Sequence, residues 1–184
     1  MNARVVLVAM AACGGAGGDP DGGTGSGSGS GHPMPVTINF DALAHNEAIT
    51  SQFMPNAMFS SESAAPDRVF RALHFADLSG TSLPNTSGAG IAGQFVDDIS
   101  VTFPHGATGL HFNIGGVQSG PSTTIAQLQL ATATGTMTVM VKGTGMIKVP
   151  VDLTQYGAVD SLNIISINDA AGLDFDDFAF TTAR

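Results

Sequence analysis

From residue 99 to the C-terminus, apolar and polar residues alternate in short runs separated by turns rich in glycine and threonine. The clearest alternating apolar positions are Ile99, Val101 and Phe103, ahead of Pro104-His105-Gly106, and Leu110, Phe112 and Ile114, ahead of Gly115-Gly116. A side-chain period of two is that of a β-strand, whose successive side chains point to opposite faces of a sheet. No segment sustains the 3.6-residue period of an amphipathic helix. The sequence therefore predicts an all-β domain in which each of these two turns ends a strand.

Further strands are expected throughout the domain. They cover residues 36–41, 69–75, 125–130, 137–141, 146–151, 162–167 and 175–181. The run at 162–167 is more continuously apolar than the others, as expected of a central strand. About nine short strands at regular intervals predict a single jelly-roll-like antiparallel β-sandwich over residues 36–184. The long segment Ser79–Gly93 is expected to be a loop, and it is a candidate binding edge.

Charge limits the classes of partner. The chain has 6 Lys and Arg residues against 15 Asp and Glu residues, which gives a formal net charge of −9. Nucleic-acid binding needs clustered cations that displace counterions from phosphates, and the cations here are scattered. The same balance argues against electrostatic docking on an anionic membrane. A charged fraction of only 11%, together with 24 Gly, favours an exported β-protein.

The first 12 residues predict a signal peptide. Arg4 supplies a positive charge, residues 5–10 are apolar, and small residues precede Cys13, the sole cysteine of the chain. The apolar run is too short for a membrane-spanning helix but long enough for the core of a signal peptide. An alternative is ordinary secretory cleavage after Ala11, which would leave Cys13 as a stray thiol. A lone cysteine excludes a disulfide within the chain.

Residues 13–35 are expected to form a flexible linker that begins at Cys13. Gly14–Gly31 contains no large apolar residue, so this segment has nothing with which to join a core. A coil of this length reaches roughly a few nanometres on average. It would hold the domain away from any surface to which Cys13 is attached.

Two resemblances to known families are carried by these residues. Ala11-Ala12-Cys13-Gly14 resembles the lipobox of bacterial lipoproteins, although Met10 stands where that family prefers Leu. This resemblance implies a lipid on Cys13 and, because Gly14 is not the Asp of inner-membrane retention, an outer-membrane or cell-surface location. A second resemblance is carried by Ile38–Asp41, Gln52–Phe59, Ser82–Asn85, Ile99–Phe103 and Asp176–Phe180. In this order they are similar to exported bacterial jelly-roll domains, which are common in PEP-CTERM-sorted proteins and related to carbohydrate-binding modules.

The second resemblance also implies a structural Ca²⁺. In jelly rolls of the carbohydrate-binding type, an acidic residue of the first strand and an Asp of the last strand commonly hold this ion. The corresponding positions are Asp41, Asp176 and Asp177, with Asp174 as a further candidate. Ca²⁺ takes six to eight oxygen ligands, many of them from carboxylates. The alternative is that these are solvated carboxylates at strand ends.

Sugar binding has one aromatic candidate. Tyr156 is the sole tyrosine and the chain has no tryptophan, so flat aromatic surfaces for stacking on sugar rings are scarce. A carbohydrate-binding module would use a concave sheet face that carries Tyr156 with amides such as Gln127 and Gln129.

Catalysis has less support from the sequence. His105 and His111 lie near Asp97 and Asp98, but no metal-binding histidine motif or nucleophile motif is present. His111 alternates with apolar neighbours and is therefore expected to face solvent.

The sequence thus predicts a non-catalytic, lipid-anchored β-sandwich of the cell envelope with a structural or ligand-binding role, and with Ca²⁺ as a candidate stabiliser. The alternative is a carbohydrate-binding module of the bacterial surface. The expected partners are a membrane, through a lipid on Cys13, and a glycan or an envelope protein. No nucleic acid is expected.

Overall fold

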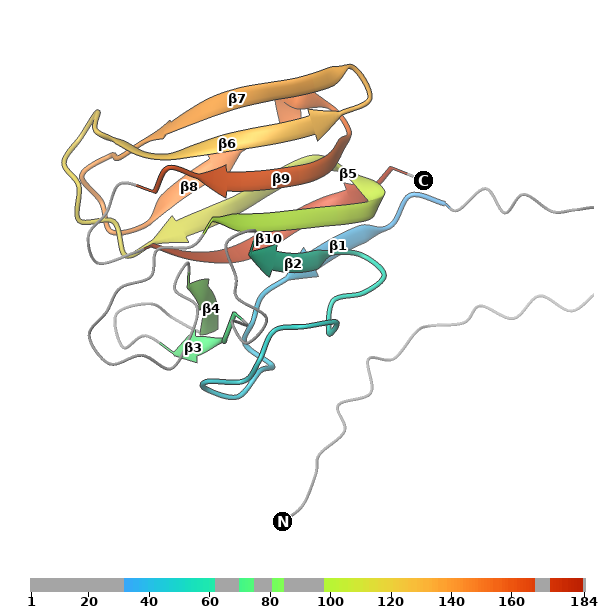
Figure 1. Ribbon diagram of the computed structural model, residues 1–184, viewed down its shortest axis with the longest axis horizontal. Helices are drawn as coiled ribbons and strands as arrows, with labels where there is room; N and C mark the ends of the chain where they lie inside the picture. Colours follow the sequence, from blue (N-terminus) through green and yellow to red (C-terminus); the bar gives the residue numbers. More distant parts are fainter. Residues whose placement is uncertain (1–31, 62–69, 75–80, 85–97, 168–172, 184) are drawn as a thin grey trace, which may run out of the picture. The chain divides into compact units, whose positions relative to one another are not determined.

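The computed structural model describes residues 32–61, 70–74, 81–84, 98–167 and 173–183 (Figure 1). In chain order the strands are β1 (Pro35–Ile38), β2 (Met58–Ser61), β3 (Leu73–His74), β4 (Thr81–Pro84), β5 (Ile99–Gly115), β6 (Thr124–Thr132), β7 (Gly135–Lys142), β8 (Val149–Asp152), β9 (Val159–Ile165) and β10 (Asp174–Thr182). A short 3-10 turn, η1 (Thr154–Tyr156), connects β8 to β9. All strand pairs among these residues are antiparallel. The predicted all-β class is confirmed.

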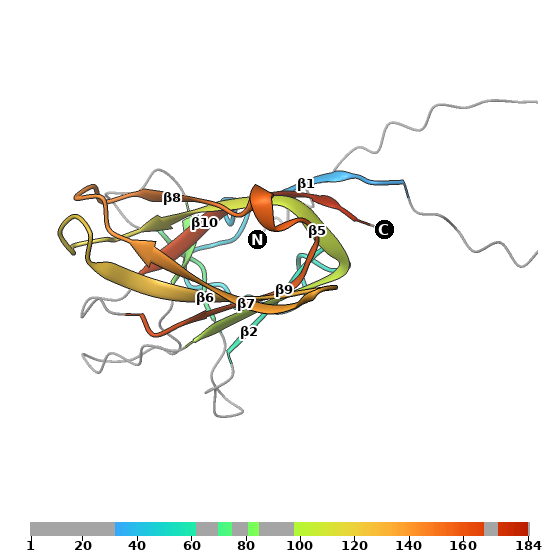
Figure 2. The same ribbon diagram turned by 90° about the horizontal axis from the view of Figure 1, so that it is seen from above.

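The strands form two layers that share β5 (Figure 2). The first part of β5 pairs with β2 and β9, and β9 continues through β6 to β7. We call this layer sheet I. The last part of β5 pairs with β8 and β10, and β10 carries β1 and β4 on its other side, with β3 beside β4. We call this layer sheet II, and together the layers form the predicted β-sandwich.

The prediction that Pro104-His105-Gly106 ends a strand is wrong. β5 runs through this segment for 17 residues, and its register with β9 shifts between Thr102 and Ala107. Gly106 and Gly109 have φ values of 66° and 65°, a left-handed backbone that glycine adopts without a steric penalty. At this corner the strand bends from one sheet into the other (Figure 2). The alternation restarts after the corner because the inward side changes with the sheet.

The first and last strands of the domain pair with each other. Val36 lies opposite Phe180, and Ile38 lies opposite Phe178. A pair of hydrogen bonds extends this ladder: the Met34 amide donates to Thr182 Oγ1, and the Thr182 amide donates to the Met34 carbonyl, both at 2.9 Å. β9 lies between β5 and β6, as expected for the most apolar strand.

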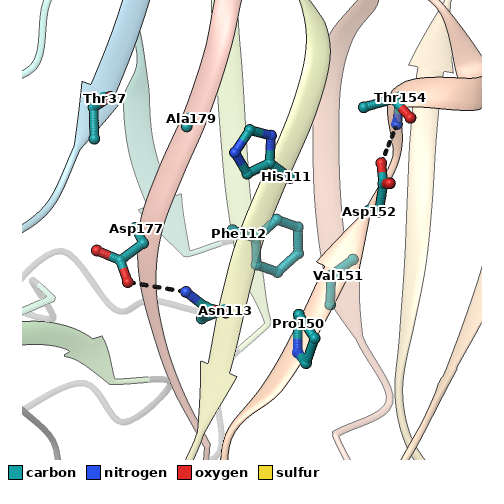
Figure 3. A pocket seen from close by; sticks show the side chains of 10 residues that line it. All are labelled: Thr37, His111, Phe112, Asn113, Pro150, Val151, Asp152, Thr154, Asp177 and Ala179. Atoms are coloured by element: carbon teal, nitrogen blue, oxygen red, sulfur yellow. Dashed lines mark hydrogen bonds between the residues drawn. The ribbon is translucent and has the colours of Figure 1, made fainter.

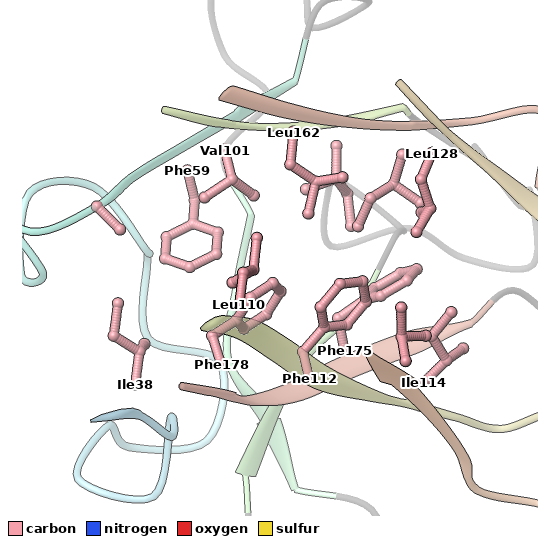
Figure 4. Packing of buried hydrophobic residues seen from close by; sticks show 14 of the residues in the cluster. Ile38, Phe59, Val101, Leu110, Phe112, Ile114, Leu128, Leu162, Phe175 and Phe178 are labelled. Carbon is pink, nitrogen blue, oxygen red and sulfur yellow. The ribbon is translucent and has the colours of Figure 1, made fainter. Parts of the chain in front are cut away.

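The hydrophobic core fills the space between the two sheets (Figure 4). Phe112 stacks on Phe178 with ring centroids 4.8 Å apart, and Phe59 meets Phe178 edge to face at 5.4 Å. Leu128 and Leu162 approach these rings from sheet I (Figure 4). Residues 31–184 form one compact unit, and every buried hydrophobic residue of the described chain belongs to it.

Several predicted features lie outside the described residues. They are the signal peptide, Cys13, most of the linker and most of Ser79–Gly93, in which only β4 is described. In the portion that the structure covers, no helix has the length and apolar character needed to cross a membrane.

Candidate functional site

A groove of about 530 Å³ lies on the outer face of sheet II, over β1, β10, β5 and β8 (Figure 3). Strand alternation creates its polar lining. On β5, the buried Phe112 separates the outward-facing His111 and Asn113, and on β8 the buried Val151 separates two exposed residues. The residues that line the groove are Thr37, His111, Phe112, Asn113, Pro150, Val151, Asp152, Thr154, Asp177 and Ala179.

Backbone pairing aligns four of these residues in one row across the sheet. Thr37 lies opposite Ala179, Ala179 opposite His111, and His111 opposite Asp152. Neighbouring strands lie about 4.8 Å apart, so the row spans roughly 14 Å. The spacing of these side chains is therefore fixed by the sheet and not by loops.

Asp177 anchors one end of the groove. It occupies a β-bulge, where the register of β10 against β5 shifts, and its φ of 55° is in the left-handed region. Its Oδ2 accepts hydrogen bonds from Asn113 Nδ2 at 2.9 Å and from Lys148 Nζ at 3.2 Å. The other carboxylate oxygen points away from Asn113 (Figure 3). The bulge thus presents the Asp177 carboxyl group beside the amide of Asn113 and the amino group of Lys148.

His111 and Asp152 form the other end. Nδ1 of His111 lies 3.0 Å from the carbonyl oxygen of Gly109, so in the neutral ring Nδ1 carries the proton and Nε2 is an acceptor. Oδ1 of Asp152 accepts a hydrogen bond from the Thr154 amide at 2.9 Å. This bond, the Thr154 hydroxyl and the nearby His111 lower the pKa of Asp152. The exposed carboxylate therefore stays ionised at neutral pH.

The four predicted calcium ligands have different environments. Asp177 lies in the groove, while Asp41 is exposed in the turn after β1. Asp174 is only 4% exposed and lies opposite Gly115, where an added Cβ would come within 2.6 Å of the Asp174 Oδ1 atom. Asp176 is half-buried next to Asp177.

Three of these carboxylates, Asp41, Asp176 and Asp177, lie near enough to interact electrostatically. Burial, together with the charges of Asp177 and Asp41, raises the pKa of Asp176 to about 6, while the hydrogen bond from the Asp177 amide and the charge of Lys148 act in the opposite direction. Within the described ranges, no three His, Cys, Asp or Glu side chains are arranged to hold a metal ion. Calcium binding stays a prediction.

Tyr156 lies apart from the groove lining. It belongs to η1, where it is half-buried and packs against the core. Gln127 and Gln129 instead point outward from β6 on sheet I, because they alternate with the buried Ala126, Leu128 and Leu130. A ligand contact at Tyr156 stays a prediction.

Most groove residues were not identified from the sequence. The outward orientation of His111 was predicted and is confirmed, and the same alternation placed Asn113 on that side. Thr37, Asp152 and Asp177 come from strands far apart in the chain, so their meeting depends on pairing that no local pattern encodes.

Among solved structures, two adhesin domains are similar in fold to this chain. No protein-family model matches the sequence, and a search of curated proteins found no relative. The structure is similar to the K2 cleaved adhesin domain of Lys-gingipain, with a TM-score of 0.42 and 13% identity over 79% of this chain and 97% of that chain. It is also similar to the K1 cleaved adhesin domain of Lys-gingipain from Porphyromonas gingivalis W83, with a TM-score of 0.37 and 14% identity over 82% and 99% of the two chains. Both similarities are too weak to transfer a function.

Proposed function

We propose that this chain is a non-catalytic ligand-binding β-sandwich of the cell envelope, attached to the membrane through a lipid on Cys13, and that the groove of sheet II is its ligand site. One observation carries the proposal. Backbone pairing holds a row of outward side chains, Thr37, Ala179, His111 and Asp152, along a groove of about 530 Å³. Concave sites with a few fixed polar groups are the usual form of ligand sites.

The groove chemistry favours a ligand rich in hydroxyl groups. Asp152 and Asp177 accept hydrogen bonds, Lys148 at the bulge donates, and Nε2 of the neutral His111 ring can accept one more. Pro150 and Ala179 add apolar surface between these polar groups. Glycans of the envelope have both hydroxyl groups and apolar ring faces, so they match this lining.

The same geometry argues against catalysis in the groove. Asp152 lies in the same cross-strand row as Ala179, two strands away from it, and Ala179 is two residues from Asp177 along β10. The backbones of the two acids are therefore roughly 12 Å apart. Backbone pairing therefore does not place the two acids opposite each other as a facing pair, which a glycosidase mechanism needs. In addition, the ring nitrogen of His111 that would need an acidic partner contacts a backbone carbonyl.

Binding can be tested with residues 31–184, which form a compact unit. The probes are an array of envelope glycans that includes peptidoglycan fragments, lipopolysaccharide and neutral polysaccharides. We expect Asp177→Asn and His111→Ala to weaken the best hit at least tenfold, while Gln129→Ala on the opposite face leaves it unchanged. Full binding by both groove variants, with their folding verified by circular dichroism, would remove the groove as the site.

A second candidate function is a carbohydrate-binding module that uses the outer face of sheet I. Ser100, Asn163, Gln129 and Thr138 lie in one row across four strands of this sheet. The hydroxyl of Ser100 donates to Asn163 Oδ1 at 2.8 Å, so these polar groups are already ordered. In the glycan array, this alternative predicts that Gln129→Ala and Asn163→Ala lose binding while the groove variants keep it.

The anchor has its own test. Cells that express the full chain and are labelled with a radioactive fatty acid should give a labelled protein in the membrane fraction. Cys13→Ser should lose both the label and the membrane location. An unlabelled protein that begins at Ala12 would instead support secretory cleavage after Ala11.

A further inference from the structure

Strand β7 forms one edge of sheet I, and within the described part of the chain it pairs with β6 alone. A strand at a sheet edge presents unpaired N–H and C=O groups along one side. Such a side can pair with a strand from another chain unless short length, charge or proline prevents it. The composition of an edge strand therefore indicates whether it pairs.

The other edge strands of the described sandwich carry protective features. β1 and β8 have four residues each and contain Pro35 and Pro150, which lack an N–H donor. β8 also ends at the charged Asp152. β2 has four residues and β3 has two, so both offer little length for pairing.

β7 carries none of these features. It is eight residues long, its sequence is GTMTVMVK, and its sole charge is Lys142 at the last position. The register shift in its ladder with β6 falls between Thr124 and Ala126 of β6, so β7 itself is regular. Its unpaired side is thus a regular and nearly uncharged edge.

Several apolar side chains of β7 are incompletely covered by the rest of the domain. Met137 and Val139 face the core and pack against it, yet both stay partly exposed. Met140, on the outer face, is 48% exposed. These positions combine backbone pairing capacity with apolar surface, which is the combination found at sheet-extending interfaces.

We propose that β7 is a homodimerisation edge, where it pairs antiparallel with β7 of a second copy and extends sheet I across a two-fold axis. A second copy fits because an antiparallel pair of identical strands is self-complementary. Met137 and Val139 of the two copies then cover each other. The chain has a net charge of −9, but β7 contains no acidic residue, so pairing here keeps the excess negative charge out of the contact. This inference is independent of the groove, which lies on sheet II.

Two variants on one cross-strand row test this interface. Thr138 on β7 lies opposite Gln129 on β6, and both point to the outer face of sheet I. Thr138→Asp brings two like charges together at a β7–β7 contact, whereas Gln129→Asp adds the same charge one strand away. The measurement is light-scattering mass against concentration for residues 31–184. Thermal melts establish that both variants are folded.

β7 offers eight residues to the contact, fewer than the roughly 20–30 residues a side of typical stable complexes, so we expect the dimer to form reversibly with rising concentration. The unsubstituted domain and Gln129→Asp should double in mass, and Thr138→Asp should stay monomeric. Amide exchange in β7 should slow as the dimer forms. A monomer up to millimolar concentration would overturn the proposal. A dimer that persists in Thr138→Asp, or one that Gln129→Asp also abolishes, would overturn it equally by assigning the contact to another surface.

Discussion

The outer faces of the two sheets differ in character although they share β5. On sheet II, β5 contributes His111 and Asn113 to a groove that also contains Asp152 and Asp177. On sheet I, the paired outward positions of β2, β5, β9, β6 and β7 are uncharged over three rows. These positions are Met58, Ser60, Ser100, Thr102, Ser161, Asn163, Ile165, Gln127, Gln129, Ala131, Thr136, Thr138 and Met140.

This difference shows that the charge of the chain is unevenly distributed over a uniform scaffold. Both faces come from antiparallel strands with the same alternation, and only the residue types at the outward positions differ. On sheet II, Asp177 occupies a bulge, and Asp174 lies against Gly115, where a larger residue would meet its carboxylate. The four predictions below test this contrast.

The largest loss of stability is expected from removal of the Phe112 ring, which separates the groove from the core. Phe112 lines the groove from beneath and stacks on Phe178. Phe112→Ala should lower the free energy of unfolding by about 3–5 kcal/mol, since it removes buried aromatic area and leaves a cavity. Urea denaturation measures this change. Met140→Ala, at an exposed position of sheet I, is the control and should stay within about 0.5 kcal/mol.

The next largest loss of stability is expected from a substitution of Gly115, which leaves space for the Asp174 carboxylate. An added Cβ would lie 2.6 Å from Asp174 Oδ1, so Gly115→Ala must displace a buried carboxylate. We expect a loss of about 1–3 kcal/mol of unfolding free energy, as for overpacked cores. Gly120→Ala is the matched control, because nothing lies within 4 Å of its added Cβ. Equal stabilities of the two variants would mean that Asp174 does not need this space.

Asp176 gives sheet II a pH dependence that the three uncharged rows of sheet I lack. Its pKa is about 6 in the folded domain against 3.8 as the reference value, so the folded state holds its proton more tightly. Stability from this group is complete below pH 3.8 and is lost as the pH rises through about 6.

Asp176→Asn should therefore be more stable than the unsubstituted domain at pH 7.5, by about 1–2 kcal/mol after allowance for solvent screening, and its advantage should vanish near pH 4. Melting temperatures from pH 4 to pH 8 in calcium-free buffer test this. An advantage that is the same at every pH would contradict the assigned titration.

The smallest effect concerns calcium. A weak extracellular type of site, with a dissociation constant of about 0.1–1 mM, would stabilise the domain by only about 0.4–1.4 kcal/mol in 1 mM Ca²⁺. We expect this gain relative to EDTA to disappear in Asp41→Ala and Asp177→Ala, while Asp152→Ala, at the far end of the groove, retains it. Identical melting in Ca²⁺ and EDTA would leave these acids as solvated carboxylates.

Sequence alone predicts which way most side chains face but not which residues meet. The alternation around Phe112 correctly assigned inward and outward positions, because the strand period is a local property. The corner of β5 was read as a strand end, since a bend into the second sheet interrupts the same pattern that a turn interrupts. The groove depends on register among four strands, and on a left-handed backbone at Asp177 that is uncommon for a non-glycine residue.

The pairing of β1 with β10 also determines how the domain responds to mechanical load. A pull through residues 32–34 enters the sandwich at β1, a four-residue strand that the two Met34–Thr182 hydrogen bonds fasten to the end of β10. Thr37 on the same strand lines the groove, directly opposite Ala179. If the N-terminus were tethered and a ligand were held in the groove, tension between them would act on the pairing of β1 with β10. The two hydrogen bonds at Met34 would then carry this load before the hydrophobic core does.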